Sequence, residues 1–224
     1  MTSLAVSTST ARSNEALYSH LSDADRYIHE TRDEAFFSLL KRHAIVSLEG
    51  LRVLELGCGD GAMIRSLAHY GANPSLIDGI DINPARASSA HAANPPARIA
   101  AGDASHLPYR NASFDLALAF TSFSSMTDEA IRARAATEAL RVLRPGGILV
   151  VYDFRVNPTN PATRPLREAE LRDLFRDRRV EIERVTLAPP IVRVLRGHRA
   201  LCRPLERLPW LRTHLLAAVT KEPQ

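Results

Sequence analysis

The 224-residue chain has few cysteines and no long hydrophobic run, and each scarcity excludes a class of protein. Its two cysteines, Cys58 and Cys202, are too few for a disulfide framework or for a zinc site built on thiolates, so we expect free thiols and no bound metal. The longest apolar runs, such as residues 116–120, fall far short of the roughly 20 residues that a membrane-spanning helix needs. A transmembrane segment is therefore not expected.

The N-terminus lacks the basic segment and continuous apolar core of a secretory signal, so the expected location is the cytoplasm. The sequence of residues 1–12 indicates a disordered polar tail. The net charge of +4 conceals an asymmetry, because residues 141–224 hold 17 Lys and Arg against 9 Asp and Glu. Most of these arginines have the spacing of solvated helix faces, so the excess does not by itself indicate an anionic partner.

Apolar runs alternate with segments of helical spacing from residue 51 onward. Between successive runs, segments such as residues 127–143 place apolar side chains at helical intervals. Strands interleaved with helices predict a parallel sheet covered by helices on both faces. The expected strands are residues 51–56, 75–82, 97–101, 114–120 and 148–154.

Further elements flank these five strands. An amphipathic helix is predicted over residues 25–46, inside a helical lid at 13–48 that precedes one domain at 49–224. After a Pro- and Asn-rich loop, two more strands are expected at the sheet edge, as a hairpin with a basic helix at about 191–201 inserted between them. The predicted fold is therefore α/β, with a doubly wound, mostly parallel, seven-stranded sheet.

One motif carries most of the chemical information. Residues 53–61, VLELGCGDG, join an apolar strand to an acid and three alternating glycines. Glycine permits a tight turn and a close approach of a ligand to the backbone, and ligands of open α/β sheets bind beyond the carboxyl ends of strands. The spacing is G-x-G-x-G, not the G-x-G-x-x-G of dinucleotide-binding proteins, and Asp60 would repel a phosphate. The turn favours a cationic ligand with a ribose and argues against a nicotinamide oxidoreductase.

On these residues the chain resembles the class I, Rossmann-like methyltransferases that use S-adenosyl-L-methionine. Glu55, Gly57, Gly59 and Gly61 match the E/D-x-G-x-G-x-G signature of that family, and the resemblance extends over about residues 50–155. It implies that Asp81 accepts hydrogen bonds from the ribose hydroxyls. The full set of cofactor contacts that it implies is Glu55, Gly57, Cys58, Gly59, Asp81, Ile82, Asp103, Ala104 and Phe120, with Tyr27 and Arg32 from the lid.

Within that set, several roles are specific. The resemblance assigns the adenine amino group to Asp103 and a backbone N–H contact to Ala104. Cys58 is expected to be a small filler whose backbone, not its sulfur, faces the cofactor. Tyr27 and Arg32 are expected to meet the methionine carboxylate, and the alternative for them is a surface stripe in which Arg32 pairs with a nearby acid.

The acceptor is expected over the ends of the fourth and fifth strands, where Ser122, Phe123 and Asp153 would line its pocket. The cofactor's sulfonium already activates the methyl group, so positioning is the main contribution of the protein, and a base is needed only for a neutral hydroxyl. Asp153 is either that base or a loop anchor, so no catalytic residue is assigned. An Asn-Pro-Pro-Tyr-like motif is missing at residues 120–123, which argues against methylation of DNA adenine.

The leading hypothesis is a methyltransferase acting on a small molecule, such as a glycan, lipid or natural-product precursor, with oxygen as the favoured acceptor atom. Two alternatives stay open. An RNA or protein methyltransferase would show a continuous basic face beside the pocket, and a cofactor-binding interaction subunit would lack turnover. No DNA partner is expected, and a homodimer is left open.

Overall fold

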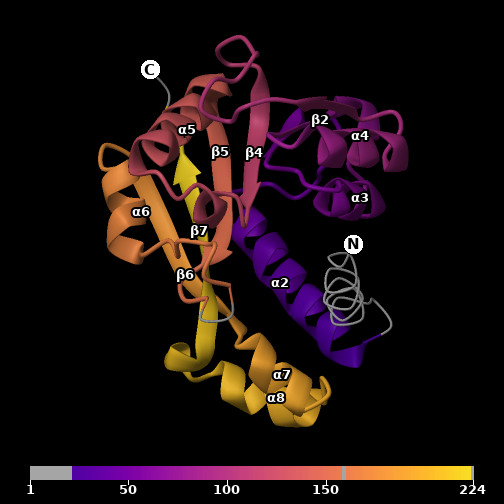
Figure 1. Ribbon diagram of the computed structural model, residues 1–224, viewed down its shortest axis with the longest axis vertical. Helices are drawn as coiled ribbons and strands as arrows, with labels where there is room; N and C mark the ends of the chain where they lie inside the picture. The colour runs from indigo at the N-terminus through magenta and orange to yellow at the C-terminus, as the bar shows by residue number, and fades with distance from the viewer. Residues whose placement is uncertain (1–21, 158–159, 223–224) are drawn as a thin grey trace, which may run out of the picture. The chain divides into compact units, whose positions relative to one another are not determined.

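The computed structural model describes residues 22–157 and 160–222, so the tail predicted at residues 1–12 lies outside the described part. One seven-stranded sheet has the order β3-β2-β1-β4-β5-β7-β6 (Figure 1). Its strands are β1 (Val53–Leu56), β2 (Ile77–Asp81), β3 (Arg98–Ala101), β4 (Phe114–Phe120), β5 (Leu143–Phe154), β6 (Arg179–Leu187) and β7 (Arg212–Thr220). The helices are α2 (Asp23–Arg42), α3 (Ala62–His69), α4 (Pro84–Ala93), α5 (Glu129–Val142), α6 (Glu168–Leu174), α7 (Pro189–Val194) and α8 (Arg199–Glu206), with 3₁₀ turns η1 (Pro74–Leu76), η2 (Phe123–Ser125) and η3 (Pro209–Leu211).

The first five strands are parallel to one another, and β7 runs antiparallel to β5. Figure 1 shows the strands between α5 and α6 on one side and α3 and α4 on the other. The predicted doubly wound, mostly parallel sheet is therefore confirmed. The chain leaves β1 toward β2 and later returns to pair β4 on the other side of β1, so the strand order reverses at β1 and β4. Ligands of such sheets bind at the carboxyl ends of the strands at this reversal.

Local sequence explains most of these elements. β1 and β2 are buried at every residue, as the apolar runs predict, whereas β3 at the sheet edge is mostly exposed. The side chains of Asn83 and Asp128 accept backbone N–H groups at the starts of α4 and α5, which is how these residue types begin helices. Gly71, at φ +94°, follows the last turn of α3, which is where glycine commonly ends a helix.

The core of the sheet on the α5 side is built from small and medium apolar residues. Ala135, Ala136 and Ala139 of α5 pack on the middle strands β4 and β5, and Leu171 of α6 and Ala217 of β7 extend the same cluster. Small alanines let the helix approach the sheet closely, so the positions of β4 and β5 relative to α5 are tightly defined. This fixes the strand ends at which the sequence places the acceptor.

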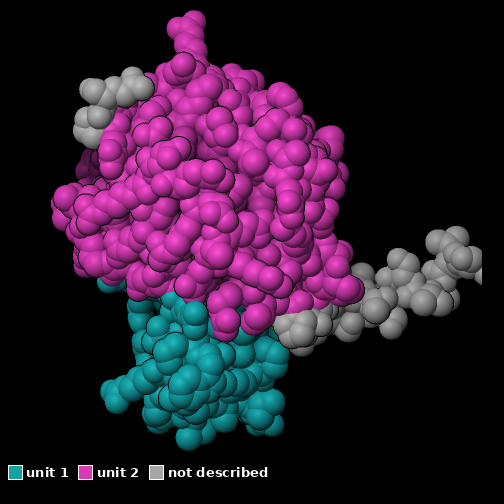
Figure 2. Space-filling model, turned by 90° about the vertical axis from the view of Figure 1, so that its left-hand side faces the viewer, with its two compact units in different colours: residues 1–38, 184–213 teal, residues 39–183, 214–224 magenta. Residues whose placement is uncertain are grey.

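The chain divides into two compact units, coloured teal and magenta in Figure 2. Unit 1 consists of residues 1–38 and 184–213, and unit 2 of residues 39–183 and 214–224. Unit 2 contains most of the sheet, and unit 1 has its own small core of Ala24, Tyr27, Leu187, Val192 and Cys202. The boundaries predicted from sequence, 13–48 and 49–224, stay predictions.

Two predicted elements differ in the structure. The single basic helix expected at about 191–201 is two helices, α7 and α8, because Arg196 and Gly197 between them adopt positive φ and interrupt the helix. The strand expected at residues 148–154 begins earlier, because β5 includes Gly146 and Gly147 at an irregularity in its pairing with β4. In the part of the chain that the structure describes, none of the helices is long and apolar enough to cross a bilayer.

Candidate cofactor and acceptor site

The glycine turn after β1 is tied to the end of β2 by its own backbone. Gly57, Gly59 and Gly61 have φ of +68°, +59° and +76°, a region that side chains other than glycine rarely occupy. The N–H groups of Gly57 and Cys58 both donate to the carbonyl oxygen of Ile80, at 2.7 and 3.0 Å. The turn therefore lies directly beside the carboxyl end of β2, as the sequence predicts.

Asp81, the last residue of β2, holds the turn from the other side. Its Oδ2 accepts the N–H of Gly59 at 2.8 Å and its Oδ1 accepts the N–H of Asn83 at 2.9 Å. The residue is only 4% exposed. A carboxylate offers about four acceptor positions, so these two bonds leave capacity for the hydroxyls of a ribose.

The turn packs too closely to accept a side chain. A Cβ built on Gly57 would lie 2.7 Å from the Oγ of Ser122, which is itself buried and donates to the carbonyl oxygen of Leu56 at 2.5 Å. A Cβ on Gly59 would meet the guanidinium of Arg86 instead, and that group is mobile enough to give way. The glycines thus let the backbone of this turn pack closely against its neighbours, as a closely bound ligand also requires.

The electrostatics beneath the turn favour a cation. Burial, followed by the charges of Glu55 and Asp81, raises the pKa of the Cys58 thiol to about 12. The thiol therefore stays protonated at neutral pH and supplies no nucleophile. The same carboxylates that disfavour a thiolate stabilise a positive ligand, and Glu55 is only 3% exposed.

A second part of the site combines an apolar and an acidic group. Ile82, directly after Asp81, is 74% exposed, which is unusual for isoleucine. Gly102 donates its N–H to the carbonyl oxygen of Asp81 at 2.9 Å, so the segment after β3 lies beside the end of β2. Asp103 follows there, and the N–H of Ser105 at 2.7 Å holds the pKa of the Asp103 carboxyl below its usual value. An apolar surface and an ionised acceptor are suited to the flat face and the amino group of adenine.

On the acceptor side, both oxygens of Asp153 are occupied by backbone. Oδ2 accepts the N–H of Ser124 at 2.9 Å and Oδ1 accepts that of Phe154 at 2.7 Å. The residue is fully buried, and burial raises its pKa to about 6. Of the two roles left open by the sequence, this geometry matches an anchor that joins the end of β5 to η2. Ser122 and Phe123, the other predicted pocket residues, are also buried.

The chain leaves β4 through a strained residue. Thr121 has φ of +55°, which a β-branched residue adopts only when its surroundings impose it, and its N–H donates to the carbonyl oxygen of Tyr152 at 2.7 Å. Phe120 stacks on Tyr152 with ring centroids 5.4 Å apart, and Tyr152 stacks on His214 at 4.7 Å. A continuous aromatic row therefore crosses the carboxyl ends of β4 and β5 and reaches β7.

Comparison with known proteins identifies this arrangement. Residues 54–151 match the methyltransferase domain family. This segment is a methyltransferase domain. Its glycine turn, acidic β2 end and sheet order are those predicted for the class I, S-adenosyl-L-methionine-dependent methyltransferases, so the predicted family and cofactor are confirmed for this segment.

Two curated methyltransferases illustrate the similarity. The 2-methyl-6-phytyl-1,4-hydroquinone methyltransferase of Synechocystis is 40% identical over 109 residues, covering 47% of this chain and 32% of the relative. The 27-O-demethylrifamycin SV methyltransferase of Amycolatopsis mediterranei is 36% identical over 116 residues, covering 49% of this chain and 41% of the relative. The matched region is thus less than half the length of each relative.

Solved structures agree on the fold. An S-adenosylmethionine-dependent methyltransferase from Mesorhizobium loti superimposes with a TM-score of 0.60 at 19% identity, covering 83% of this chain and 97% of that one. At this identity the likeness establishes the methyltransferase fold alone. It extends well beyond residues 54–151, so the flanking elements belong to the same architecture.

The methyltransferase domain contains positioning residues that the sequence does not reveal. Arg132 of α5 has a fully buried side chain, and its guanidinium donates to the carbonyl oxygens of Met126 and Arg164 at 3.1 and 2.9 Å and to Glu170 at 2.6 Å. These partners lie after η2, in the loop after β5 and on α6. One arginine therefore connects three segments around the acceptor side, and an arginine in a helix of alternating Arg and Ala gives no sign of this in the sequence.

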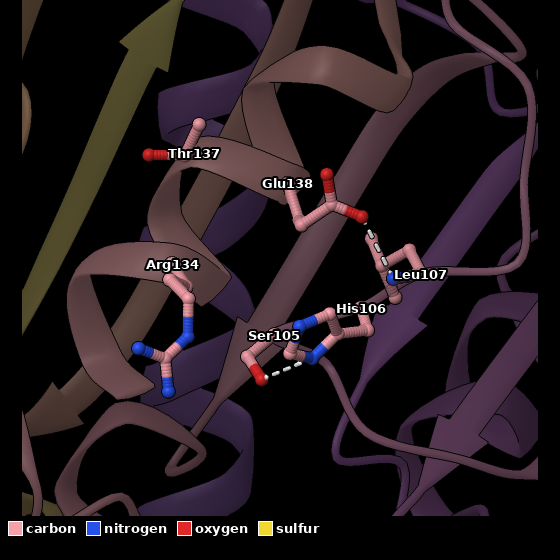
Figure 3. A pocket seen from close by; sticks show the side chains of 6 residues that line it. All are labelled: Ser105, His106, Leu107, Arg134, Thr137 and Glu138. Atoms are coloured by element: carbon pink, nitrogen blue, oxygen red, sulfur yellow. Dashed lines mark hydrogen bonds between the residues drawn. The ribbon is translucent and has the colours of Figure 1, made fainter. Parts of the chain in front are cut away.

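A shallow pocket lies beside the methyltransferase site, between the segment after β3 and α5 (Figure 3). Glu138 accepts the N–H of Leu107 at 2.7 Å and thereby ties that segment to α5. The side chain of His106, which also lines the pocket, is 73% exposed. We assign a supporting role to the residues that line this pocket, since they hold in place the segment that carries Asp103.

Tyr27 and Arg32 lie in unit 1, whereas the glycine turn lies in unit 2. Tyr27 is 2% exposed in the core of unit 1, where the guanidinium carbons of Arg199 and Arg203 each lie 5.9 Å from its ring centroid. Arg32 pairs with Asp33 at 2.7 Å, as its alternative interpretation expects. Their contact with the cofactor stays a prediction.

Proposed function

We propose that the protein transfers the methyl group of S-adenosyl-L-methionine to a hydroxyl oxygen of an apolar small molecule. The observation that carries the proposal is the acceptor side, where Phe120 stacks on Tyr152 and both oxygens of Asp153, the next residue of β5, are already bonded to backbone. We expect a ring-shaped, apolar acceptor to lie near this aromatic row. The site offers no strong base in Asp153.

The chain's residues account for binding and orientation. Asp81 is suited to the ribose hydroxyls, Asp103 to the adenine amino group, and Ile82 to the face of the base. The backbone of the glycine turn and the nearby Glu55 are suited to the ammonium group at the amino acid end. The bound cofactor supplies an activated methyl group, so the protein's remaining task is to hold the acceptor oxygen in line with it.

Because both oxygens of Asp153 are bonded to backbone, this carboxylate is not free to act as a base. This narrows the range of acceptors that we propose. An aliphatic hydroxyl loses its proton with difficulty, whereas a phenol or hydroquinone has a pKa near 10, close enough to neutrality for loss of its proton to water. Two matched relatives are named for a hydroquinone and for an O-demethylated compound, which supports an acceptor that carries hydroxyl groups. We therefore favour an acidic aromatic hydroxyl over a sugar hydroxyl.

The test begins with calorimetric titration of S-adenosyl-L-methionine and S-adenosylhomocysteine, followed by assay of S-adenosylhomocysteine release with panels of hydroquinones, phenols, hydroxylated lipids, sugars and RNA. Mass spectrometry of the product then locates the added methyl group. Turnover with phenols or hydroquinones and a methyl ether as product would support the proposal. Turnover confined to RNA, or tight cofactor binding without turnover on any panel, would favour the two alternatives.

A further inference from the structure

Unit 1 exposes apolar side chains over a short stretch of sequence. Val194, Leu201 and Trp210 are 82%, 53% and 68% exposed. They are three of the seven large hydrophobic residues that are exposed in the described part of the chain. Single exposed apolar residues are ordinary in folded proteins, but three within residues 194–210 are a local concentration. We call Val194, Leu201 and Trp210 the apolar set.

The contacts of α8 show which side of it carries Leu201. Cys202 is buried in the core of unit 1, and Arg199 and Arg203 reach across to Glu30 and Glu34 of α2. Successive residues of a helix are rotated by about 100°, so Leu201 and Arg203 lie on nearly opposite sides of α8. Leu201 shares its side with Pro204, three residues later, and Pro204 is also exposed. The side of α8 toward α2 is therefore basic, and its arginines are paired with carboxylates. A different side of α8 is apolar and exposed. Trp210 lies in η3, which contacts α8.

The same stretch has an excess of positive charge. Residues 189–213 contain six arginines and a single acid, Glu206. Three of these arginines pair with carboxylates of α2, and Arg212 donates to the carbonyl oxygens of Arg184 and Glu206. Arg196 and Arg207 are exposed, and neither has an ion pair with any residue that the structure describes. Two guanidinium groups are therefore available to an anionic partner.

We propose that this part of unit 1 binds the surface of an anionic lipid bilayer. The apolar set would enter the headgroup region, and Arg196 and Arg207 would contact lipid phosphates. Tryptophan is favoured at the boundary between water and hydrocarbon, and long arginine side chains keep their charge at the phosphate level while their stems lie along apolar groups. Each basic residue near such a surface adds attraction that salt weakens.

The arrangement fits a bilayer better than a second protein. The apolar residues stand singly and alternate in sequence with arginines, whereas a stable protein interface of ordinary size buries a contiguous surface of about 800 Å² on each partner. A headgroup layer adapts to separated apolar side chains and provides a phosphate for each arginine. This proposal concerns unit 1 and does not depend on which acceptor the enzyme uses.

Sedimentation of the full-length protein with vesicles tests the proposal, using phosphatidylcholine alone or mixed with phosphatidylglycerol. We expect binding to the mixed vesicles that weakens as salt rises and that is weaker on phosphatidylcholine. In Arg196→Glu/Arg207→Glu, affinity for the mixed vesicles should fall by at least about tenfold. In Val194→Ser/Leu201→Ser/Trp210→Ser it should fall comparably, and Trp210→Ser alone replaces this variant if circular dichroism shows that the triple variant is unfolded.

Matched controls change equally exposed residues of unit 2. Val46→Ser/Tyr70→Ser removes exposed apolar side chains, and Arg110→Glu/Arg172→Glu makes the same change of charge. Both should bind vesicles like the unaltered protein. Failure of the unaltered protein to bind mixed vesicles would overturn the proposal, as would full binding by both unit 1 variants. A dimer in light scattering that the apolar variant abolishes, without vesicle binding, would assign the surface to a second copy of the chain and equally overturn it.

Discussion

The backbone N–H of Gly59 donates to Oδ2 of Asp81 across 2.8 Å, and this bond joins the two halves of the cofactor site. Gly59 belongs to the turn after β1, and Asp81 ends β2. Because the same carboxylate that would accept the ribose hydroxyls also fixes the turn, the geometry of the two binding elements cannot vary independently. Loss of Asp81 therefore removes a ligand contact and loosens the surface that receives the rest of the ligand.

Asp81→Ala should weaken binding of S-adenosyl-L-methionine by about 1 to 3 kcal/mol, or roughly 5- to 150-fold, because a buried charged acceptor is lost. Isothermal titration calorimetry measures the change. Asp78→Ala is the matched control, since Asp78 is a buried carboxylate on the same strand whose partner is Arg98, away from the turn. Equal affinities for the two variants would contradict the role given to Asp81.

Gly57→Ala should lose cofactor affinity by at least about tenfold. The alanine would be strained at φ +68° and its Cβ would lie 2.7 Å from the Oγ of Ser122, so the turn or Ser122 must shift. Gly71→Ala is the control for backbone strain alone. Gly71 has φ of +94°, but nothing lies within 4 Å of the added Cβ. Gly71→Ala should lose about 1 kcal/mol of stability in urea unfolding, Gly57→Ala should lose more because of the added contact with Ser122, and only Gly57→Ala should lose binding. Undiminished binding by Gly57→Ala would place the ligand elsewhere.

Arg86 was not singled out by the sequence, yet its Nη1 lies 3.9 Å from Oδ2 of Asp81. S-adenosyl-L-methionine carries one more positive charge than S-adenosylhomocysteine, so this cation should disfavour the substrate form of the cofactor relative to the product form. Arg86→Gln is therefore expected to shift the ratio of the two affinities toward S-adenosyl-L-methionine by about twofold, the small size reflecting the exposure of Arg86. Titration of both ligands at low and high salt measures the ratio. An unchanged ratio at low salt would show that Arg86 lies outside the field of the sulfonium.

The parts of the site that the sequence predicts are those carried by backbone. A G-x-G-x-G turn, an acid at the end of the next strand and the order of strands depend on glycine conformations and hydrophobic runs, which single-sequence patterns record directly. Glu55, Gly57, Gly59, Asp81 and Asp103 are accordingly found at strand ends that the topology brings together.

The parts that the sequence does not predict depend on contacts between distant segments. Nothing near Asp153 in the sequence indicates that its oxygens accept N–H groups from both Ser124 and Phe154, and nothing near Arg132 indicates that it is fully buried. The division of the chain into two units is similar, because residues 184–213 join residues 22–38 through packing of Tyr27 with Cys202 and Val192. Local propensity contains no information about such pairings.

Arg132→Met should destabilise the protein by about 3 kcal/mol, because it leaves Glu170 and two carbonyl oxygens without their buried donor. Urea unfolding measures the loss. Arg134→Met, two residues along the same helix at an exposed position, should change stability by less than about 0.5 kcal/mol. Cofactor affinity should be nearly unchanged in both, since neither residue contacts the glycine turn. Once an acceptor is known, Arg132→Met should raise its KM more than it lowers kcat.

Asp153 gives the protein a pH dependence of definite sign. Its pKa is raised by burial from 3.8 to about 6 in the folded state, so its ionisation costs stability. The contribution is fully present below about pH 3, where the group is protonated in both states, and is lost as pH rises through 6. Asp153→Asn cannot ionise, so its stability relative to the unaltered protein should increase by about 2 kcal/mol between pH 4 and 7.

Asp128→Asn is the control for this measurement, because the pKa of Asp128 is shifted in the opposite direction to that of Asp153. The N–H of Ile131 lowers the pKa of the exposed Asp128 carboxyl, so replacing it should bring no relative gain of stability as pH rises. The activity of Asp153→Asn then distinguishes a structural anchor from a general base. If Asp153 were the general base, Asp153→Asn would lower kcat by about 10²- to 10⁴-fold. Because both of its oxygens are already bonded to backbone, we expect a smaller loss of less than about tenfold, together with the pH-dependent gain in stability.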